Sequence, residues 1–518
     1  MTRISLARLY SGREHYKPGC EQIAADGSET GGEDIIMGNT QFNERNISMV
    51  MDMYELTMSN GYFNKKDQDT VVAFDVFYRS NPDNAGFSIF AGLEQVVEYI
   101  QNMRFSEEDV EYLRSRNLFT EEFLDYLRHF KFKGDIYAMP EGTIMYPNEP
   151  IMTVVAPLID AQLIETAVLL QINHQSLIAT KTNRIVRAAN GKPVSDFGAR
   201  RAHNVDAAVY GARAAYIGGA VGTATVLAGQ MFGIPISGTM AHSWVMSFEN
   251  EYEAFKAYAE SYPDSTVLLV DTYDVLHSGV PNAIRVAKEV LEPEGKRLKG
   301  IRLDSGDLAY LSKEARKLLD DAGLRDCIIV ASNSLDEYTI SSLNRQEALI
   351  DSYGVGEKLI TSSTTPVFGA VYKLAAVERD GEFVPKIKIS ETAEKITNPG
   401  IKEIYRVYDK EGKAVADYLT VKGEKIDTSG PVRYVDPIHY WKNRSFVDCT
   451  FKPLQKQVFK DGELVYTLPP LDEIRNYVRD QLEHEIWKEE QRFENSHTHY
   501  LDMSPAMFEL KMSLLHEK

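Results

Sequence analysis

The feature that most constrains the fold is a regular alternation of short apolar runs and amphipathic stretches between residues 193 and 363. The apolar runs include TVLLVDTY, KGIRLDS and CIIVASN, and each is followed by apolar residues at helical spacing. Strands that are apolar along almost their whole length are typical of a parallel sheet covered on both faces. Six or seven such βα units in succession favour a closed barrel over an open sheet. We therefore predict an α/β fold built on an irregular βα barrel.

The chain on either side of this repeat has a different pattern. Residues 46–160 mix helical segments with short strands, and residues 373–518 contain several hairpins and a charged helix. We predict that the barrel spans 161–372 and carries the active site. The C-terminal part is expected to pack back on the N-terminal part, which gives a discontinuous α+β second domain. Residues 1–45 are polar and lack apolar periodicity, so we predict a disordered or weakly ordered extension there.

Charge and cysteine content restrict the class of partner and compartment. The net charge is −19, which argues against nucleic acid or an anionic membrane as the main partner, because both favour basic surfaces. The three cysteines, Cys20, Cys327 and Cys449, are too few and too far apart to predict a disulfide framework or a zinc site. The apolar run 151–172 is interrupted by charged and polar residues and is too polar to span a bilayer. A cytoplasmic enzyme is therefore expected.

Polar side chains and glycines follow the predicted strands, at the end where α/β folds bind ligands. These positions are Asp196, Thr239, His242, Asp271, Asp274, Arg302, Asp304, Asn333, Gly354 and Gly356. His242, in GTMAH, has an imidazole that is able to attack phosphorus, although a structural histidine at a strand end is the simpler alternative. Arg302 offers a planar fork for a carboxylate, and Asp304 suits ribose hydroxyls or Mg²⁺. An ion pair with a helix cap explains the same two residues equally well.

Two further groups have both a structural and a functional interpretation. Asp271 and Asp274, in VDTYD, suit a metal-chelated pyrophosphate, or they are simply capping residues. The sequence GVG at Gly354 and Gly356 is typical of a phosphate cradle, but a G-x-G pair alone is a weak signal.

Aromatic residues give a similar choice. Phe197 and Arg200, in DFGARR, are placed to stack on and orient an aromatic anion, or they are a core aromatic and a surface cation. Tyr54 on the first predicted helix is most simply a core residue.

The ordered set of motifs resembles the nicotinate phosphoribosyltransferase family, which belongs to the type II phosphoribosyltransferases. The resemblance runs from about residue 52 to residue 505, and a set of motifs carries it. These motifs are DMYELTM, FYRSNPDNAGFSIFAGLE, SDFGARRAH, GTMAHSW, DTYD, RLDSGD, ASNSLDE, GVG and FGAVYKL. Each motif alone is weak, but their order over more than half of the chain is highly specific.

This resemblance implies a reaction and a set of partners. Nicotinate and 5-phosphoribosyl pyrophosphate would give nicotinate mononucleotide and pyrophosphate, the first step of NAD synthesis from nicotinate. ATP hydrolysis would be coupled to the transfer through a phosphohistidine, with Mg²⁺ as cofactor. The resemblance also implies a homodimer whose active sites are shared between subunits.

The resemblance assigns roles to residues of this sequence. His242 matches the phosphorylated histidine, and Asp271 and Asp304 match acidic residues around the ribose and Mg²⁺. The expected substrate-binding residues are Tyr54 (supplied by the other subunit), Phe197, Arg200, Thr239 and Arg302. The expected phosphate-binding residues are Ser332, Asn333, Gly354 and Gly356.

Two positions refine the expected specificity. The related nicotinamide enzyme carries an Asp in a G-T-D-T segment, whereas the sequence here is GTAT with Ala224. A carboxylate at that position would repel a carboxylate substrate, so Ala224 favours nicotinate. Glu357, directly after GVG, would disfavour a phosphate unless it points away. One rival function is a non-catalytic sensor of these compounds, but a sensor would not need His242, and the intact set of His, Arg and Asp residues argues against it. The other is a phosphosugar-binding isomerase or another barrel enzyme, which the combination of GTMAHSW with RLDSGD argues against.

Overall fold

The computed structural model describes residues 45–392, 395–437, 439–441 and 443–516. Three sheets of six or seven strands organise these residues. The predicted N-terminal extension lies outside the described residues, apart from Arg45.

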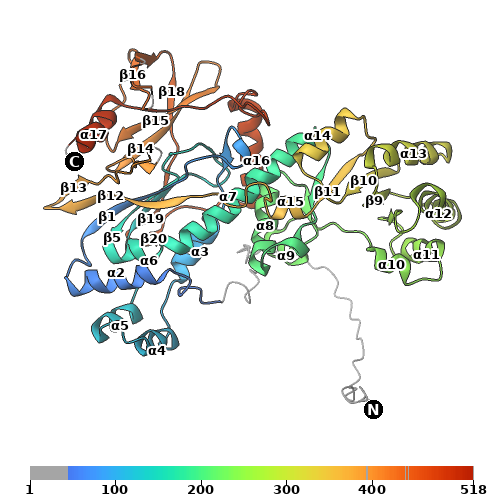
Figure 1. Ribbon diagram of the computed structural model, residues 1–518, viewed down its shortest axis with the longest axis horizontal. Helices are drawn as coiled ribbons and strands as arrows, with labels where there is room; N and C mark the ends of the chain where they lie inside the picture. Colours follow the sequence, from blue (N-terminus) through green and yellow to red (C-terminus); the bar gives the residue numbers. More distant parts are fainter. Residues whose placement is uncertain (1–44, 393–394, 438, 442, 517–518) are drawn as a thin grey trace, which may run out of the picture. The chain divides into compact units, whose positions relative to one another are not determined.

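The central element for function is a six-stranded parallel sheet with the order β7-β6-β11-β10-β9-β8 (Figure 1). Its strands are β6 (Val194–Asp196), β7 (Gly222–Thr223), β8 (Val267–Leu269), β9 (Gly300–Leu303), β10 (Ile328–Ser332) and β11 (Ser352–Val355). Helices connect them, as the βα alternation predicted. The α/β class is therefore confirmed.

This parallel sheet is open rather than closed. Its described ladder ends at β7 on one side and at β8 on the other, and no described pairing joins these two strands. The run IPISG, which we expected to supply a barrel strand, contributes only one isolated bridge, between Thr223 and Ile236. The chain between β7 and β8 is instead occupied by α9 (Val226–Phe232), α10 (His242–Met246) and α11 (Glu251–Ser261). The expectation of a closed barrel is thus not met by the described strands.

Strands from distant parts of the sequence share a seven-stranded sheet with the order β13-β12-β1-β5-β3-β19-β20. Its strands are β1 (Val71–Phe77), β3 (Asp135–Ala138), β5 (Met152–Pro157), β12 (Val371–Arg379), β13 (Glu382–Pro385), β19 (Lys456–Lys460) and β20 (Glu463–Leu464). Strand β1 pairs with both β5 and β12, and β3 pairs with both β5 and β19, in each case antiparallel. Six of the seven residues of β1 are buried, because the sheet is covered on both faces.

The C-terminal strands form another six-stranded sheet, in the order β17-β16-β21-β15-β14-β18. Its strands are β14 (Lys402–Tyr408), β15 (Ala414–Val421), β16 (Val432–Val435), β17 (Asn443–Phe446), β18 (Thr450–Pro453) and β21 (Leu501–Met503). The short strands β2 (Ser88–Ile89) and β4 (Ile144–Met145) pair with each other.

The long helix α7 (Glu165–Ala188) contacts a helix of the N-terminal part and helices that connect the strands of the parallel sheet (Figure 1). The other longer helices are α2 (Met53–Asn64), α3 (Leu93–Asn102), α4 (Glu107–Ser115), α5 (Glu121–Arg128), α6 (Leu158–Leu163), α8 (Val205–Ile217), α12 (Val280–Val286), α13 (Leu308–Asp321), α14 (Glu337–Arg345), α16 (Leu471–Asp480) and α17 (Pro505–His516). Short helical turns are η1 (Pro82–Asn84), η2 (Ala199–Arg201), η3 (Val275–Gly279), η4 (Ala287–Leu291), η5 (Glu292–Glu294), η7 (Gln481–Glu485) and the four-residue α15 (Glu357–Ile360).

The charged helix predicted over residues 471–493 is shorter than expected, because α16 and η7 end at Glu485. Among the described residues, none of the helices has the length and apolar character that crossing a membrane requires.

Candidate active site

The predicted site residues lie at the carboxyl ends of adjacent parallel strands. Phe197 follows β6, Gly354 lies in β11 and Ser332 ends β10. Asp304 and Asp271 follow β9 and β8. Because neighbouring strands in the order β6-β11-β10-β9-β8 are parallel, these five positions share one edge of the sheet.

Arg302 is the best-anchored cation at this edge. It lies on β9, its side chain is only 14% exposed, and its Nη1 donates to the Thr239 hydroxyl and, at 3.3 Å, to the Met240 carbonyl oxygen. Its Nη2 lies 3.8 Å from Asp304 Oδ1. Arg302 Nε is buried without a hydrogen-bond partner among the described residues, which leaves a donor available for a ligand.

Two opposing influences act on the Arg302 guanidinium. Burial lowers the pKa of Arg302, and the charge of Arg200 lowers it further, while Asp304 and Asp271 raise it. Arg200 lies in η2 and is exposed. Two guanidinium groups that interact electrostatically in this way favour an anion bound near them, because the anion relieves their mutual repulsion.

Asp304 and Asp271 are joined through backbone and hydroxyl groups. Asp271 Oδ2 accepts from the Asp304 amide at 3.0 Å and from the Ser305 hydroxyl at 2.6 Å. Asp304 Oδ1 accepts from the hydroxyl of Ser332. Asp271 Oδ1 is buried and has no hydrogen-bond partner among the described residues. This oxygen is therefore available to a hydroxyl or a cation.

His242 is the first residue of α10, and its ring is 40% exposed. Its Nδ1 lies 3.1 Å from the Thr272 hydroxyl, and its Nε2 lies 3.7 Å from Asp304 Oδ2. The imidazole is thus oriented on one side by Thr272 and faces a carboxylate on the other. Thr272, between Asp271 and Asp274, escaped the sequence interpretation. A hydroxyl beside a strand-end carboxylate was the only signal for it.

Phe197 owes its position to two structural features. A Cβ atom on Gly354 would lie 2.3 Å from atoms of the Phe197 ring, so this glycine makes room for the aromatic side chain. The turn that carries Phe197 is fixed by the buried Asp196, which accepts from the Gly198 amide and the Thr223 hydroxyl, both at 2.8 Å. Burial raises the pKa of Asp196, and these hydrogen bonds oppose that shift.

One strained turn lies among the residues that the resemblance assigned to phosphate binding. Asn333 has a left-handed φ of 75°, and Ser334, directly after it, has a φ of 52°. Two consecutive residues in this region are costly without glycine and are typical of a functional loop. Gly356 precedes α15, and the Glu357 carboxylate lies 3.9 Å from Arg201 Nε, with both side chains mostly exposed.

Asp274 and Tyr54 do not join this cluster. Asp274 caps η3 by accepting from the amides of Leu276 and His277, which agrees with the capping interpretation. Tyr54 lies on α2, which contacts α6 and α5, and Figure 1 shows α2 well separated from α10. Its ring is 43% exposed; burial and then the Glu165 charge raise the pKa of Tyr54.

The described residues contain no cluster of three or more His, Cys, Asp or Glu side chains that would hold a metal on its own. One or two carboxylates with additional substrate oxygens are a common way to hold Mg²⁺. Asp271 Oδ1 and Asp304 at this edge fit an ion of that kind, bound together with a polyphosphate substrate.

This combination defines a class: an α/β protein whose parallel sheet gathers cations, carboxylates and hydroxyls at its carboxyl edge, where α/β enzymes bind their ligands. Residues 49–173 match the family model of the nicotinate phosphoribosyltransferase (NAPRTase) N-terminal domain, and residues 401–511 match that of the nicotinate phosphoribosyltransferase C-terminal domain. The chain belongs to the nicotinate phosphoribosyltransferase family.

Individual relatives support this assignment and confirm the resemblance seen in the motifs. A nicotinate phosphoribosyltransferase of Bacillus subtilis is 44% identical over 92% of this chain and 96% of its own length. One from Dictyostelium discoideum is 37% identical over 84% of this chain and 82% of its own length. The crystal structure of human nicotinic acid phosphoribosyltransferase superimposes with a TM-score of 0.80 at 27% identity, covering 90% of this chain and all of the human one.

Proposed function

We propose that the protein transfers the phosphoribosyl group of 5-phosphoribosyl pyrophosphate to nicotinate and releases pyrophosphate. The observation that carries this proposal is the pair of unpartnered polar atoms at one sheet edge, Arg302 Nε and Asp271 Oδ1. The first is a donor suited to a carboxylate, and the second is an acceptor suited to a ribose hydroxyl or a cation. Family membership argues for this enzyme activity over a sensor or an isomerase.

Arg302 would bind the carboxylate of nicotinate. Thr239 and the Met240 carbonyl hold Nη1, so the guanidinium plane is fixed before the substrate arrives. Phe197, seated over Gly354, would stack on the pyridine ring. These two contacts would hold the ring nitrogen close to the anomeric carbon, which contributes through proximity.

The acidic pair would act on the ribose. As the bond between the anomeric carbon and pyrophosphate breaks, positive charge develops on the ribose and negative charge on the leaving group. Asp271 and Asp304 lie where they would favour the positive charge and bind ribose hydroxyls. Mg²⁺, when bound, would neutralise charge on the pyrophosphate leaving group. The loops at Ser332, Asn333, Gly354 and Gly356 would contact phosphate oxygens through hydroxyl and backbone N–H groups.

His242 would take part in coupling to ATP. Its Nε2 would attack the terminal phosphorus of ATP, the Nε2–P bond would form, and the bond to the ADP oxygen would break with its electron pair leaving on ADP. In the tautomer that carries its proton on Nδ1, the Nδ1–H group would donate a hydrogen bond to the Thr272 hydroxyl oxygen. The lone pair would then remain on Nε2. The phosphate on His242 would add negative charge beside Asp304 and reorganise the ribose and pyrophosphate site.

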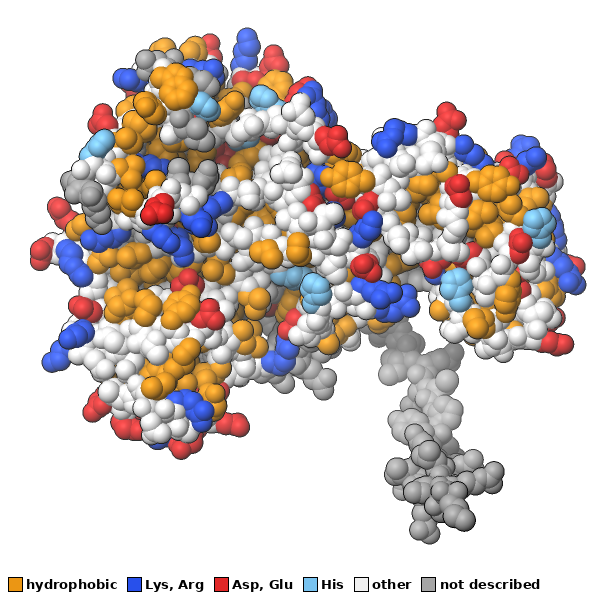
Figure 2. Space-filling view, in the orientation of Figure 1, with side chains coloured by type: hydrophobic (Ala, Val, Ile, Leu, Met, Phe, Trp, Pro, Cys, Tyr) orange, Lys and Arg blue, Asp and Glu red, His pale blue; other side chains and the backbone are white. Residues whose placement is uncertain are grey.

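Tyr54 would complete the site of a second subunit. Its helix, α2, is well separated from α10 in Figure 1, so we infer that Tyr54 stacks on a ring in the partner's site rather than in that of its own chain. The large hydrophobic residues Val50, Met53 and Met58 are exposed beside it, and Figure 2 shows hydrophobic side chains at the surface where Figure 1 places α2. A homodimer that covers this surface would bring Tyr54 to the partner's nicotinate site.

The test combines phosphate labelling with the synthetic reaction. Wild-type protein incubated with terminally labelled ATP is expected to carry an acid-labile phosphate, and nicotinate with 5-phosphoribosyl pyrophosphate is expected to yield nicotinate mononucleotide. His242→Ala should lose the label, whereas the exposed His277→Ala should keep it. Label retained by His242→Ala would refute the phosphohistidine, and no product from wild type would refute the proposed reaction.

A further inference from the structure

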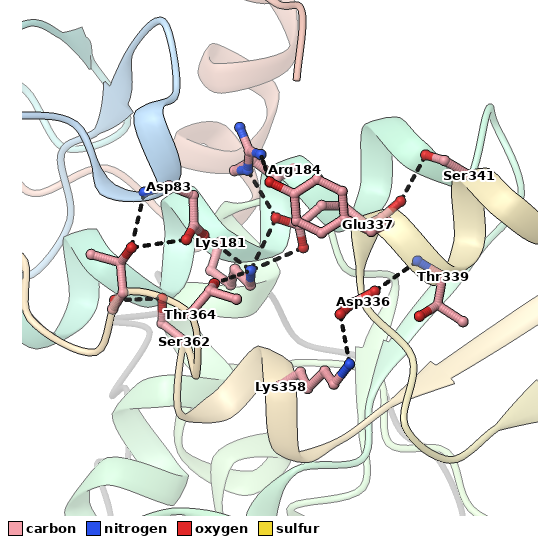
Figure 3. A network of polar contacts seen from close by, with 12 residues as sticks. Asp83, Lys181, Arg184, Asp336, Glu337, Thr339, Ser341, Lys358, Ser362 and Thr364 are labelled. Atoms are coloured by element: carbon pink, nitrogen blue, oxygen red, sulfur yellow. Dashed lines mark hydrogen bonds and ion pairs between the residues drawn. The ribbon is translucent and has the colours of Figure 1, made fainter. Parts of the chain in front are cut away.

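A buried lysine joins three separate segments of the chain (Figure 3). Lys181 lies on α7 and its side chain is 1% exposed. Its Nζ contacts Asp83 Oδ2 at 3.0 Å, Glu337 Oε1 at 3.0 Å and the Thr364 hydroxyl at 2.9 Å. All three ammonium donors therefore have partners, and each partner belongs to a different segment of the chain.

Two of these segments adjoin loops that we assign to phosphate binding. Glu337 begins α14, directly after the strained turn at Asn333 and Ser334 that leaves β10. Thr364 lies just beyond α15, which follows Gly356. The single ammonium of Lys181 thus ties the loop after β10 to the segment after β11.

The two loops are also joined directly, by an ion pair closer to the surface. Lys358 Nζ, on α15, lies 2.7 Å from Asp336 Oδ2, at the N-cap of α14. Burial alone would raise the pKa of Asp336, but the hydrogen bond from Lys358 keeps it below its usual value. Lys181 links the two loops in the interior and Lys358 links them nearer the surface, so their spacing is fixed at two points.

The third segment comes from the N-terminal region. Asp83 has a left-handed φ of 53°, and its Oδ1 accepts from the Thr365 hydroxyl at 2.9 Å. Arg184, one helical turn after Lys181, donates its Nε to Glu337 at 3.0 Å. Two cations therefore face two carboxylates in an almost fully buried network.

An arrangement of this kind is not needed for stability alone. Burying charges is costly, and well-packed apolar side chains of similar volume are often equally stable or more so. The network differs from an apolar contact in that it specifies direction and distance for each segment. That property is valuable where loops must present hydroxyl and N–H groups to phosphate oxygens.

We propose that Lys181 is a positioning residue that holds the loops after β10 and β11 at the spacing required to bind the phosphate groups of the phosphoribosyl substrate. This inference rests on the proposed function, since it assumes that these loops contact phosphate. Lys181 itself is buried behind them and touches no substrate.

The test uses a charge-balanced variant, because Lys181→Met alone leaves Asp83 buried without its cation. In Lys181→Met with Asp83→Asn, Glu337 keeps Arg184 and no carboxylate of the network is left without a cation. We expect the KM for 5-phosphoribosyl pyrophosphate to rise about 10-fold or more, since small displacements of binding groups have large effects. The KM for nicotinate should change by less than about 3-fold, because Arg302 lies on β9 and Phe197 packs on Gly354 within β11 rather than on the segment after it.

A matched pair elsewhere in the chain is the control. Lys402 Nζ lies 2.6 Å from Asp75 Oδ2, and both side chains are buried. Lys402→Met with Asp75→Asn removes a similar buried ion pair and should not separate the two KM values. Equal changes in both KM values for the Lys181 variant, unchanged values, or the same separation in the control would overturn the proposal.

Calorimetric binding of inorganic pyrophosphate separates this inference from the proposed function. The Lys181 variant should bind pyrophosphate about 10-fold more weakly than wild type does, even if the nicotinate reaction were absent. Equal pyrophosphate affinity in the two proteins would refute the positioning role while leaving the proposed reaction untouched.

Discussion

The imidazole Nδ1 of His242 lies 3.1 Å from the hydroxyl of Thr272, and the two residues come from different βα units. This contact directs the Nδ1 edge of the ring towards Thr272, and Nε2 then points towards Asp304. The orientation of the proposed phosphorylated residue therefore depends on a side chain that carries no charge.

Thr272→Val is expected to slow labelling of His242 by ATP about 5- to 10-fold, which is the value of one hydrogen bond. Thr272→Ser keeps the hydroxyl and should label at nearly the wild-type rate. Quench-flow measurement of acid-labile phosphate distinguishes them. Equal rates for the valine and serine variants would show that the contact does not orient the ring for phosphorylation.

Gly354→Ala should displace the Phe197 ring, because the new Cβ atom would lie 2.3 Å from ring atoms. We expect a loss of about 1–3 kcal/mol in stability from overpacking and a raised KM for nicotinate. Phe197→Ala removes the clash, so the double variant should have the KM of Phe197→Ala alone and regain stability relative to Gly354→Ala. Additive effects on KM would mean that the glycine acts independently of the ring.

Ala224→Asp tests the basis of substrate choice. Ala224 is exposed just after β7, and its amide donates to the Asp196 carbonyl at 2.8 Å. A carboxylate here should repel nicotinate and raise its KM about 10-fold, while activity on nicotinamide increases. Ala224→Asn, which adds similar volume without charge, is the control. Parallel loss of both activities in the Asp variant would indicate a steric effect only.

The shared site is tested by mixing two inactive variants. Tyr54→Ala and His242→Ala subunits, allowed to exchange, should regain up to about a quarter of wild-type activity, because about half of the dimers are mixed and each mixed dimer has one of its two sites with both residues intact. Light scattering and subunit exchange of labelled proteins establish that mixed dimers form. Mixed dimers without any activity would contradict the contribution of Tyr54 across the interface.

A buried carboxyl group outside the site predicts a pH dependence of stability. Burial, and then the charge of Asp436, raises the pKa of Asp502 to about 7. An Asp in the unfolded chain has a pKa of about 3.9, so the folded state binds this proton more tightly. The resulting stabilisation is complete below about pH 4 and is lost as the pH rises towards 7.

Asp502→Asn removes this titration. Its stability relative to wild type should increase between pH 5 and pH 8, by a few kcal/mol at most. Thermal unfolding at several pH values measures the difference. The exposed Asp321→Asn should show no such trend, and a pH-independent difference for Asp502→Asn would disprove the assignment.

Sequence patterns were sufficient to predict the α/β class and the strand-end location of the site. Apolar runs identify buried parallel strands, and parallel strands bring their following residues to one edge, so Asp271, Arg302 and Asp304 were predicted to be neighbours. The contact between His242 and Thr272 was not predictable, because it depends on the rotation of a short helix relative to β8. Lys181 was also missed: its partners lie about 100 and 160 residues away, and helical periodicity does not distinguish a buried cation from an exposed one.

The number of βα units predicted a barrel, and the described strands form its parallel sheet without a pairing that closes it. A count of units does not reveal that the segment containing Ile236 would form one bridge rather than a strand. The choice depends on what packs against that segment, and α9, α10 and α11 are the helices that the chain forms between β7 and β8.

The seven-stranded sheet has a consequence for how the chain is made. β1, β3 and β5 leave the ribosome first, yet β1 needs β12 and β3 needs β19 to complete their hydrogen bonding. The parallel sheet, whose strands all lie between residues 194 and 355, has its full set of strands before β12 and β19 emerge. During synthesis the edges of β1 and β3 therefore stay unpaired until these later strands emerge, and unpaired strand edges promote aggregation. A nascent chain stalled after β11 would have every strand of the parallel sheet, while the edges of β1 and β3 would still lack β12 and β19.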